Sequence, residues 1–130
     1  MHRIAVLSLL ALLAVPLGAC SPGERGSTIS QRELSSEIAG GKKIVLLDVR
    51  TPEEFQGGHI PGAINVPHDG SGEWLRNQSL SPDTDIVVYC ESGRRSAIAQ
   101  QLFVTAGFTS VRHLEGDMKA WRECAECAQQ

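Results

Sequence analysis

One segment, Ile86-Val87-Val88-Tyr89-Cys90-Glu91-Ser92-Gly93-Arg94-Arg95-Ser96, indicates the architecture of the whole chain. Its first four residues form a short, unbroken apolar run, which is typical of a strand buried on both faces. A helix is predicted from Arg94 or Arg95 to Ala106. A buried strand that leads through a short loop into a helix is the repeating unit of an α/β sheet.

Similar units precede and follow this segment. Strands are predicted at 44–47, 63–66 and 111–114, and capping boxes at 30–33 and 51–54 predict helix starts. Further helices are expected near 74–77 and over 117–127. The alternation predicts a single α/β domain with an about five-stranded, mostly parallel sheet flanked by helices on both faces. The predicted inner face of the helix after Cys90 consists of Ala97, Ile98, Gln101, Leu102 and Thr105.

The loop after the strand 86–89 is predicted to make Cys90 a nucleophile. Gly93 gives the backbone the freedom to curl around the sulfur, so that N–H groups of the loop and of the following helix converge on it. Arg94 and Arg95 add positive charge, whereas Glu91 opposes it. The amides and the guanidinium groups favour a thiolate at Cys90. A buried, inert cysteine would explain Cys90 but not the glycine and paired arginines beside it.

Other polar residues follow the strand 44–47. In open parallel sheets, ligands bind beyond the carboxyl ends of the strands, where Arg50 and Cys90 both fall. Asp48 is interpreted as a structural hydrogen-bonding group, and Arg50 as a residue that supports the site. His59 could act as a general base, but a histidine that positions a turn is the favoured interpretation.

Three motifs occur in order along the chain. They are Asp48-Val49-Arg50 with Glu54-Phe55 and the run GHIPGAINVP at 58–67, then Cys90-x-x-Gly93-x-Arg95, then Leu114-Glu115-Gly116 with Ala120-Trp121. Together they resemble the rhodanese family in its single-domain bacterial form, over roughly residues 29–122. Asp117 departs from the pattern, because the family often has a second glycine there. The departure concerns the turn rather than the chemistry.

The resemblance implies sulfur transfer in two half-reactions. Cys90 would take a sulfane sulfur from thiosulfate or a similar anionic donor and carry it as a persulfide to cyanide, a thiol or a protein cysteine. The residues implied in substrate binding are Glu91, Ser92, Gly93, Arg94, Arg95 and Arg50. No metal or organic cofactor is implied. A non-catalytic sulfur-carrier or docking module of the same fold is the alternative.

Phosphatases and arsenate reductases of related fold are a less favoured alternative. Their loops follow the pattern Cys-x5-Arg, whose wider cradle holds a tetrahedral oxyanion. Here Ser96 occupies the sixth place after Cys90 and Arg95 the fifth, so the loop is one residue shorter. Tyr89 also precedes the cysteine where the phosphatases usually have histidine.

The first 28 residues are expected to lie outside the domain, which spans 29–127. His2 and Arg3 precede an apolar run at 4–15 that is too short to span a bilayer, so residues 1–19 are predicted to be a signal peptide. Leu17-Gly18-Ala19-Cys20 resembles a lipobox, which implies lipidation of Cys20 and a flexible tether over 20–28. The expected location is periplasmic, anchored by lipid to the outer membrane. Ordinary cleavage, which would give a soluble periplasmic protein, is the alternative.

The remaining cysteines form the pattern Cys124-Ala125-Glu126-Cys127. Such spacing can be a redox pair, a zinc half-site or a local disulfide. A local disulfide or a frayed tail is favoured because an exported compartment is oxidising, and a persulfide-accepting relay is the alternative. His68 and His113 show no metal-ligand spacing with the cysteines. The net charge of −3 argues against a nucleic-acid partner.

Overall fold

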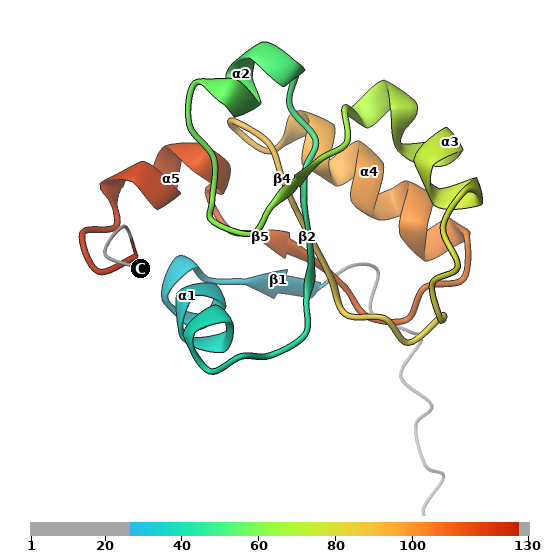
Figure 1. Ribbon diagram of the computed structural model, residues 1–130, viewed down its shortest axis with the longest axis horizontal. Coiled ribbons are helices and arrows are strands. Elements are labelled where there is room, and N and C mark those ends of the chain that lie inside the picture. Colours follow the sequence, from blue (N-terminus) through green and yellow to red (C-terminus); the bar gives the residue numbers. More distant parts are fainter. Residues whose placement is uncertain (1–26, 128–130) are drawn as a thin grey trace, which may run out of the picture.

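The computed structural model describes residues 27–127, which contain a five-stranded sheet (Figure 1). Its strands are β1 (Ser27–Ile29), β2 (Val45–Asp48), β3 (Ile64–Asn65), β4 (Ile86–Tyr89) and β5 (Val111–Leu114). The spatial order is β1-β5-β4-β2-β3, and every neighbouring pair is parallel. The predicted single α/β domain with a five-stranded parallel sheet is therefore confirmed.

Helices cover both faces of the sheet. They are α1 (Gln31–Ala39), α2 (Pro52–Gln56), the 3₁₀ turn η1 (His68–Gly70), α3 (Ser71–Arg76), α4 (Arg94–Thr105) and α5 (Asp117–Glu123). Leu34 of α1 and Trp121 of α5 pack in one core cluster, while Phe103 of α4 packs in another with Trp74 of α3 at its edge. Figure 1 shows α1 and α5 on one side and α3 and α4 on the other.

The central strand β4 explains why the segment 86–89 has an unbroken apolar sequence. All four of its residues are buried. Val87 and Tyr89 join the cluster under α1 and α5, whereas Ile86 and Val88 join the cluster under α3 and α4. Because successive side chains of a strand point to opposite faces, a strand covered on both sides needs apolar residues at every position.

The domain begins earlier than predicted. Ser27 and Thr28, assigned above to the tether, form β1 with Ile29 and pair in parallel with β5. Ile29 is 1% exposed and anchors the strand in the core. The two polar residues gave no apolar signal, since β1 lies at the edge of the sheet and only its last residue is buried.

The predicted inner face of α4 is wrong. The buried residues of this helix are Ser96, Ala99 and Phe103, whereas Ile98 is 52% exposed. Apolar side chains occur all around the helix, so their spacing alone did not identify the buried face. Helix α5 ends at Glu123, before the predicted end at Cys127.

Helix starts follow their capping sequences. Thr51 accepts a hydrogen bond from the Glu54 N–H, and the Glu54 carboxylate accepts one from the Thr51 N–H, which completes the predicted capping box of α2. Pro52 occupies the first helical position, where no N–H is needed. This arrangement fixes the direction in which Glu54 points.

The predicted signal peptide, the lipidation site Cys20 and the tether up to residue 26 lie outside the described residues. Within 27–127 the structure contains no helix with the length and apolar character needed to cross a lipid bilayer.

Candidate functional site

Polar residues from three adjacent strands meet at the carboxyl edge of the sheet. Arg50 follows β2, Cys90 follows β4, and Asp117 opens α5 soon after β5. These strands are neighbours in the order β5-β4-β2. The position of the site therefore agrees with the rule for parallel sheets.

The Cys90 sulfur is held inside its own loop. The residue is 1% exposed, and its Sγ accepts a hydrogen bond from the Gly93 N–H at 3.0 Å. Ser96 Oγ lies 3.3 Å from the sulfur. Gly93 adopts a φ of 109°, which turns its N–H toward the sulfur just before the first residue of α4. An amide and a helix N-terminus directed at one sulfur favour negative charge on it.

The first turn of α5 supports the other side of the loop. The Met118 N–H donates to the Cys90 carbonyl at 3.0 Å, and the Lys119 N–H donates to the Glu91 carbonyl at 3.2 Å. These two N–H groups have no partner within their own helix, since they lie in its first turn. The loop is therefore hydrogen-bonded to the N-terminus of α5 and continues directly into the N-terminus of α4.

Asp117 ties the Cys90 backbone to this support. Its Oδ1 accepts from the Cys90 N–H and from the Ser96 hydroxyl, both at 2.8 Å, and its Oδ2 lies 2.9 Å from His113 Nε2. Burial raises the pKa of Asp117, but the hydrogen bonds from His113, Cys90 and Ser96 outweigh it and lower the pKa below its ordinary value. Asp117 is therefore an ionised, buried carboxylate beside the sulfur.

Gly93 cannot acquire a side chain without disturbing this network. A Cβ at residue 93 would lie 3.1 Å from Asp117 Oδ2 and 3.6 Å from His113 Cε1. We expect Gly93→Ala to lower stability by about 1–3 kcal/mol through its φ and to slow alkylation of Cys90 about tenfold by displacing the loop amide. Urea unfolding and the rate of reaction with iodoacetamide measure the two effects.

Gly41→Ala is the matched control for this substitution. Gly41 also has a positive φ, 74°, but a Cβ there would meet nothing within 4 Å. The control should lower stability and leave alkylation of Cys90 unchanged. Equal alkylation rates in the two alanine variants would contradict the proposed role of the Gly93 amide.

Arg95 is less available to a substrate than the sequence suggested. Its guanidinium binds both carboxylate oxygens of Glu54, at 2.6 and 2.9 Å. This pairing is the main reason that the pKa of Glu54 falls to about 2 from 4.5. Because the folded pKa is the lower one, the pair contributes stability above about pH 4.5 and loses it as the pH falls toward 2.

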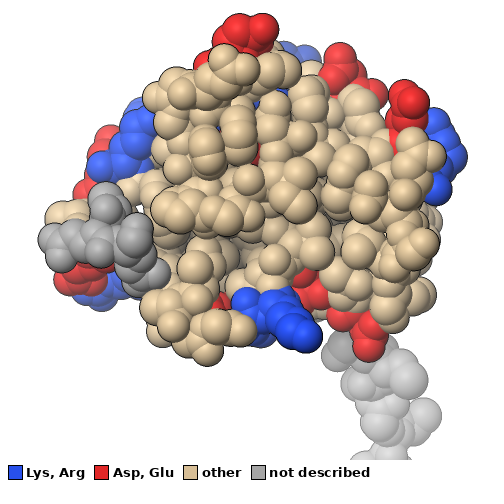
Figure 2. All heavy atoms as spheres, viewed as in Figure 1, with Lys and Arg blue, Asp and Glu red and all other residues tan. Residues whose placement is uncertain are grey.

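Arg94 is the exposed cation of the loop. It lies at the first position of α4, and no ion pair to it occurs among the described residues. Ser92, also predicted to bind substrate, is exposed in the same loop. Figure 2 shows charged side chains of both signs around the edge of the visible face, without a broad basic surface.

Glu91 is paired with two arginines. Arg122 of α5 donates to its Oε2 at 3.0 Å, and Arg50 Nη1 lies 3.4 Å from the same oxygen. The hydrogen bond from Arg122 lowers the pKa of Glu91 against the opposing effect of burial. The negative charge of Glu91, predicted to oppose the thiolate, is thus largely compensated.

Arg50 lies beneath the loop. Its side chain is 1% exposed and pairs with Asp48, with Nη2 2.6 Å from Oδ2, and Nη2 also donates to the Gly58 carbonyl at 2.7 Å. The guanidinium lies 5.9 Å from the centroid of the Tyr89 ring. Each of the three guanidinium nitrogens of Arg50 thus has a protein partner. Its contact with the Cys90 loop is the one between Nη1 and Glu91. This placement agrees with a supporting role for Arg50 better than with direct substrate contact.

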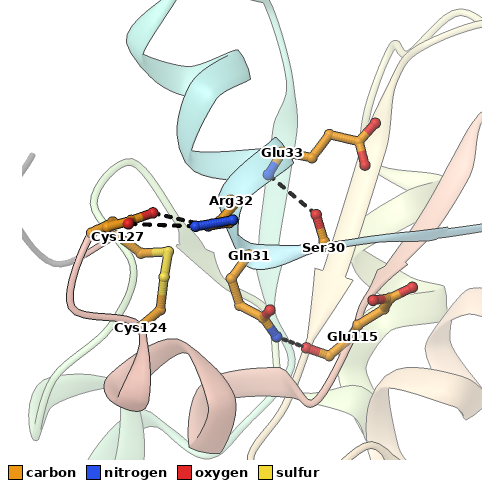
Figure 3. Close-up of a disulfide and its surroundings, with 8 residues drawn as sticks. Ser30, Gln31, Arg32, Glu33, Glu115, Cys124 and Cys127 are labelled. Carbon is orange, nitrogen blue, oxygen red and sulfur yellow. Dashed lines mark hydrogen bonds and ion pairs between the residues drawn. A yellow bond between two sulfur atoms is a disulfide. The ribbon is translucent and has the colours of Figure 1, made fainter.

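The remaining cysteines form a disulfide, Cys124–Cys127, away from this site. Cys127 is 2% exposed and packs in the cluster under α1 and α5, whereas Cys90 belongs to the cluster on the opposite face. Figure 3 shows the disulfide beside Arg32 at the start of α1. Arg32 forms an ion pair with Glu126, which lies between the two cysteines in the sequence. The favoured local disulfide is confirmed. Among the described residues, Cys90 is the free cysteine.

Sequence reasoning missed several residues of the site. His113 was considered only as a metal ligand, and Asp117 only as a departure from a glycine pattern. A signal was present, because both lie at the carboxyl end of a predicted parallel strand, where functional groups collect. The partners Glu54 and Arg122 gave no comparable signal, since only the fold brings them to the loop.

His59 lies outside this cluster. Its Nδ1 lies 2.9 Å from the Phe55 carbonyl, and its ring stacks on the Phe55 ring at 3.6 Å between centroids. These contacts support the interpretation of His59 as a residue that positions a turn.

Comparison with known proteins agrees with the geometry. A family described as "Rhodanese-like domain" matches residues 30–124. The probable adenylyltransferase/sulfurtransferase MoeZ of Mycobacterium tuberculosis is 42% identical over 99 residues, which cover 75% of this chain but 25% of MoeZ. A sulfurtransferase of Allochromatium vinosum is 34% identical over 93 residues, covering 72% of this chain and 85% of that protein.

A solved structure gives a similar result. The human single-domain sulfurtransferase TSTD1 superimposes with a TM-score of 0.72 at 30% identity, covering 78% of this chain and 99% of that one. The chain thus spans about a quarter of MoeZ and nearly all of TSTD1.

Proposed function

Because the chain belongs to the rhodanese-like domain family, we propose that it is a sulfurtransferase with Cys90 as its sulfur-carrying nucleophile. Similar proteins described as sulfurtransferases, including single-domain ones, support this proposal. The observation that carries it is the Gly93 N–H directed at Cys90 Sγ at 3.0 Å, at the N-terminus of a twelve-residue helix. An inert cysteine would not need such an anion-binding environment.

The proposed donor is thiosulfate or a similar anionic donor of sulfane sulfur. The Cys90 thiolate attacks the outer sulfur of thiosulfate, forms an S–S bond, and releases sulfite with the electron pair of the broken bond. Cyanide, a thiol or a protein cysteine then attacks the outer sulfur, takes it, and regenerates the thiolate. The two half-reactions share one covalent intermediate, so ping-pong kinetics are expected.

Arg94 is the better candidate for attracting the donor. Arg95 belongs to the motif Cys90-x-x-Gly93-x-Arg95, but its charge is paired with Glu54. The hydrogen bonds to Glu54 are the main reason that the pKa of Arg95 is raised, burial opposes them, and the charge of Cys90 adds a smaller rise. In the proposal Arg95 stabilises the anionic sulfur, and the exposed Arg94 draws the anion toward the loop.

The phosphatase alternative is less well supported. Ser96, at the sixth place after the cysteine, is buried and turns its hydroxyl toward Asp117. The buried carboxylate of Asp117, which accepts a hydrogen bond from this hydroxyl, would repel a phosphate. The short loop and the carboxylate therefore favour a single sulfur over a tetrahedral oxyanion.

Export and lipidation at Cys20 are part of the proposal. They rest on the sequence of residues 1–20 and on one structural observation, the disulfide Cys124–Cys127. Disulfides persist in oxidising compartments such as the periplasm.

Mass spectrometry after incubation with thiosulfate tests the proposed function. We expect Cys90 to gain the mass of one sulfur atom and to lose it on addition of cyanide, with release of thiocyanate. Treatment with inorganic phosphate and a phosphate ester should leave the residue unmodified. An unmodified Cys90 in a folded protein would contradict catalysis and favour the docking module.

A further inference from the structure

Asp117 occupies a conformation that side chains rarely adopt. Its φ is 54°, and no other non-glycine residue in 27–127 has a positive φ. The residue is also 2% exposed, so a charged carboxylate is buried here at a cost that requires compensation. Compensation comes entirely from groups around the Cys90 loop.

The hydrogen bonds of Asp117 determine where protons lie in this network. An ionised carboxylate can only accept, so the His113 Nε2 that faces Oδ2 at 2.9 Å must carry its hydrogen and donate it. Ser96 Oγ lies 2.9 Å from the same nitrogen. In a catalytic triad, the carboxylate and the hydroxyl bind opposite nitrogens of the histidine ring. Here Asp117 and Ser96 both face Nε2 of His113, so His113 is not placed to act as a general base toward Ser96.

The Ser96 hydroxyl has a single proton and several acceptors. Asp117 Oδ1 lies at 2.8 Å, the Gly93 carbonyl at 3.0 Å and Cys90 Sγ at 3.3 Å. The charged carboxylate is the nearest and strongest acceptor. When Asp117 holds this proton, Ser96 Oγ presents a lone pair to the sulfur, which suits a thiol and disfavours a thiolate.

We propose that Asp117 is a positioning residue that holds the Ser96 hydroxyl proton away from Cys90 and thereby restrains ionisation of the sulfur. His113 supports Asp117 by donating to its second oxygen. When the thiolate forms, its own proton leaves to solvent and the Ser96 hydroxyl becomes shared between two anions. The inference deepens the proposed function, on which it rests in taking Cys90 as the reacting residue.

Other charges surround the sulfur and stay unchanged in the test below. They are Arg95 on α4 with Glu54 of α2, Glu91 in the loop with Arg122 of α5, and Arg50 with Asp48 after β2. Each of these is an ion pair, whereas Arg94, at the first position of α4, has no ion pair among the described residues.

Asp117→Asn tests the proposal with the full chain. Asparagine keeps an acceptor for the Cys90 N–H and Ser96, and its amide can donate to the other tautomer of His113, but the negative charge is gone. We expect the pH midpoint of Cys90 alkylation by iodoacetamide to move down, so that alkylation below the midpoint is about tenfold faster. Peptide mass spectrometry assigns the label to Cys90.

Glu123→Gln is the matched control, because it removes an exposed carboxylate from the same helix. Its midpoint should equal that of the unsubstituted protein. In a Ser96→Ala background, Asp117→Asn should shift the midpoint by less than half as much, since the hydroxyl is then absent. Thermal unfolding shows whether each variant is folded.

Two results would overturn the inference: an unchanged midpoint in folded Asp117→Asn, or a full shift that persists without the Ser96 hydroxyl. If Asp117→Asn does not fold, Ser96→Ala alone decides. Its midpoint should fall, because the oxygen lone pair that disfavours the thiolate is gone, whereas an unchanged or raised midpoint would contradict the inference. Alkylation needs no sulfur donor, so these results are independent of the test for sulfur transfer.

Discussion

Thiocyanate formation from thiosulfate and cyanide is expected to fall at least about 1,000-fold in Cys90→Ser, because no other group in the site can hold the persulfide. Serine preserves the size and the hydrogen bond from Gly93, which lies 3.0 Å from the sulfur in the unsubstituted protein. The variant should therefore fold normally. A coupled colour assay for thiocyanate at fixed pH measures the loss.

The double variant Cys124→Ser/Cys127→Ser separates this role from that of the disulfide. The disulfide packs on the opposite face of the sheet from Cys90, so the cyanide reaction should keep its rate. With thiol acceptors an equal rate is also expected, and a selective loss would favour a relay through the pair. Thiocyanate at the original rate in Cys90→Ser would refute the proposed mechanism.

Arg50→Ala is expected to destabilise the fold by about 3–5 kcal/mol, because it leaves Asp48 buried without its charge partner. Asp48 is 0% exposed and pairs with Arg50 at 2.6 Å. Burial would lower the pKa of Arg50, but the hydrogen bonds and charge of Asp48 outweigh it and raise it. The cation therefore stays charged at every pH that the fold tolerates. Urea unfolding measures the loss.

Arg32→Ala provides the comparison for an exposed ion pair. Arg32 bonds to Glu126 at 2.9 Å, but the two side chains are 75% and 71% exposed. Water screens such a pair, so we expect a loss below about 1 kcal/mol. Similar losses in the two variants would show that Arg50 and Asp48 do not form the buried support described above. Cys90 alkylation in Arg50→Ala should also change, since Glu91 loses one of its two arginines.

Much of the site was predictable because chemistry and local geometry coincide in one loop. Cys90, Gly93 and the start of α4 are adjacent in the chain, and a positive-φ glycine between a strand and a helix can turn its amide onto the cysteine. The pairing of Arg95 with Glu54 was not predictable in this way, because Glu54 lies 41 residues away in the chain. No local pattern reports such a contact.

The hydrophobic pattern alone predicted the buried strands of the sheet, but it did not identify the buried face of α4. Unbroken apolar runs identified β2, β4 and the two-sided burial of the sheet, since each position of a covered strand faces a core. In α4 both Ile98 and Phe103 are apolar, but only Phe103 is buried. Which of the two packs inward depends on how α4 is rotated about its own axis relative to the sheet, and the preceding loop sets that rotation.

By itself, the sequence determined that the chain forms a parallel α/β sheet with a cysteine at its carboxyl edge, because strand burial and loop conformation are local properties. Tertiary structure alone decided which charges are free and which are paired. It placed Glu54 on Arg95, Arg122 on Glu91, and Asp117 with His113 on the Cys90 loop. The physical reason is that ion pairs and proton positions depend on distances between elements far apart in the chain, which exist only after the sheet has brought them together.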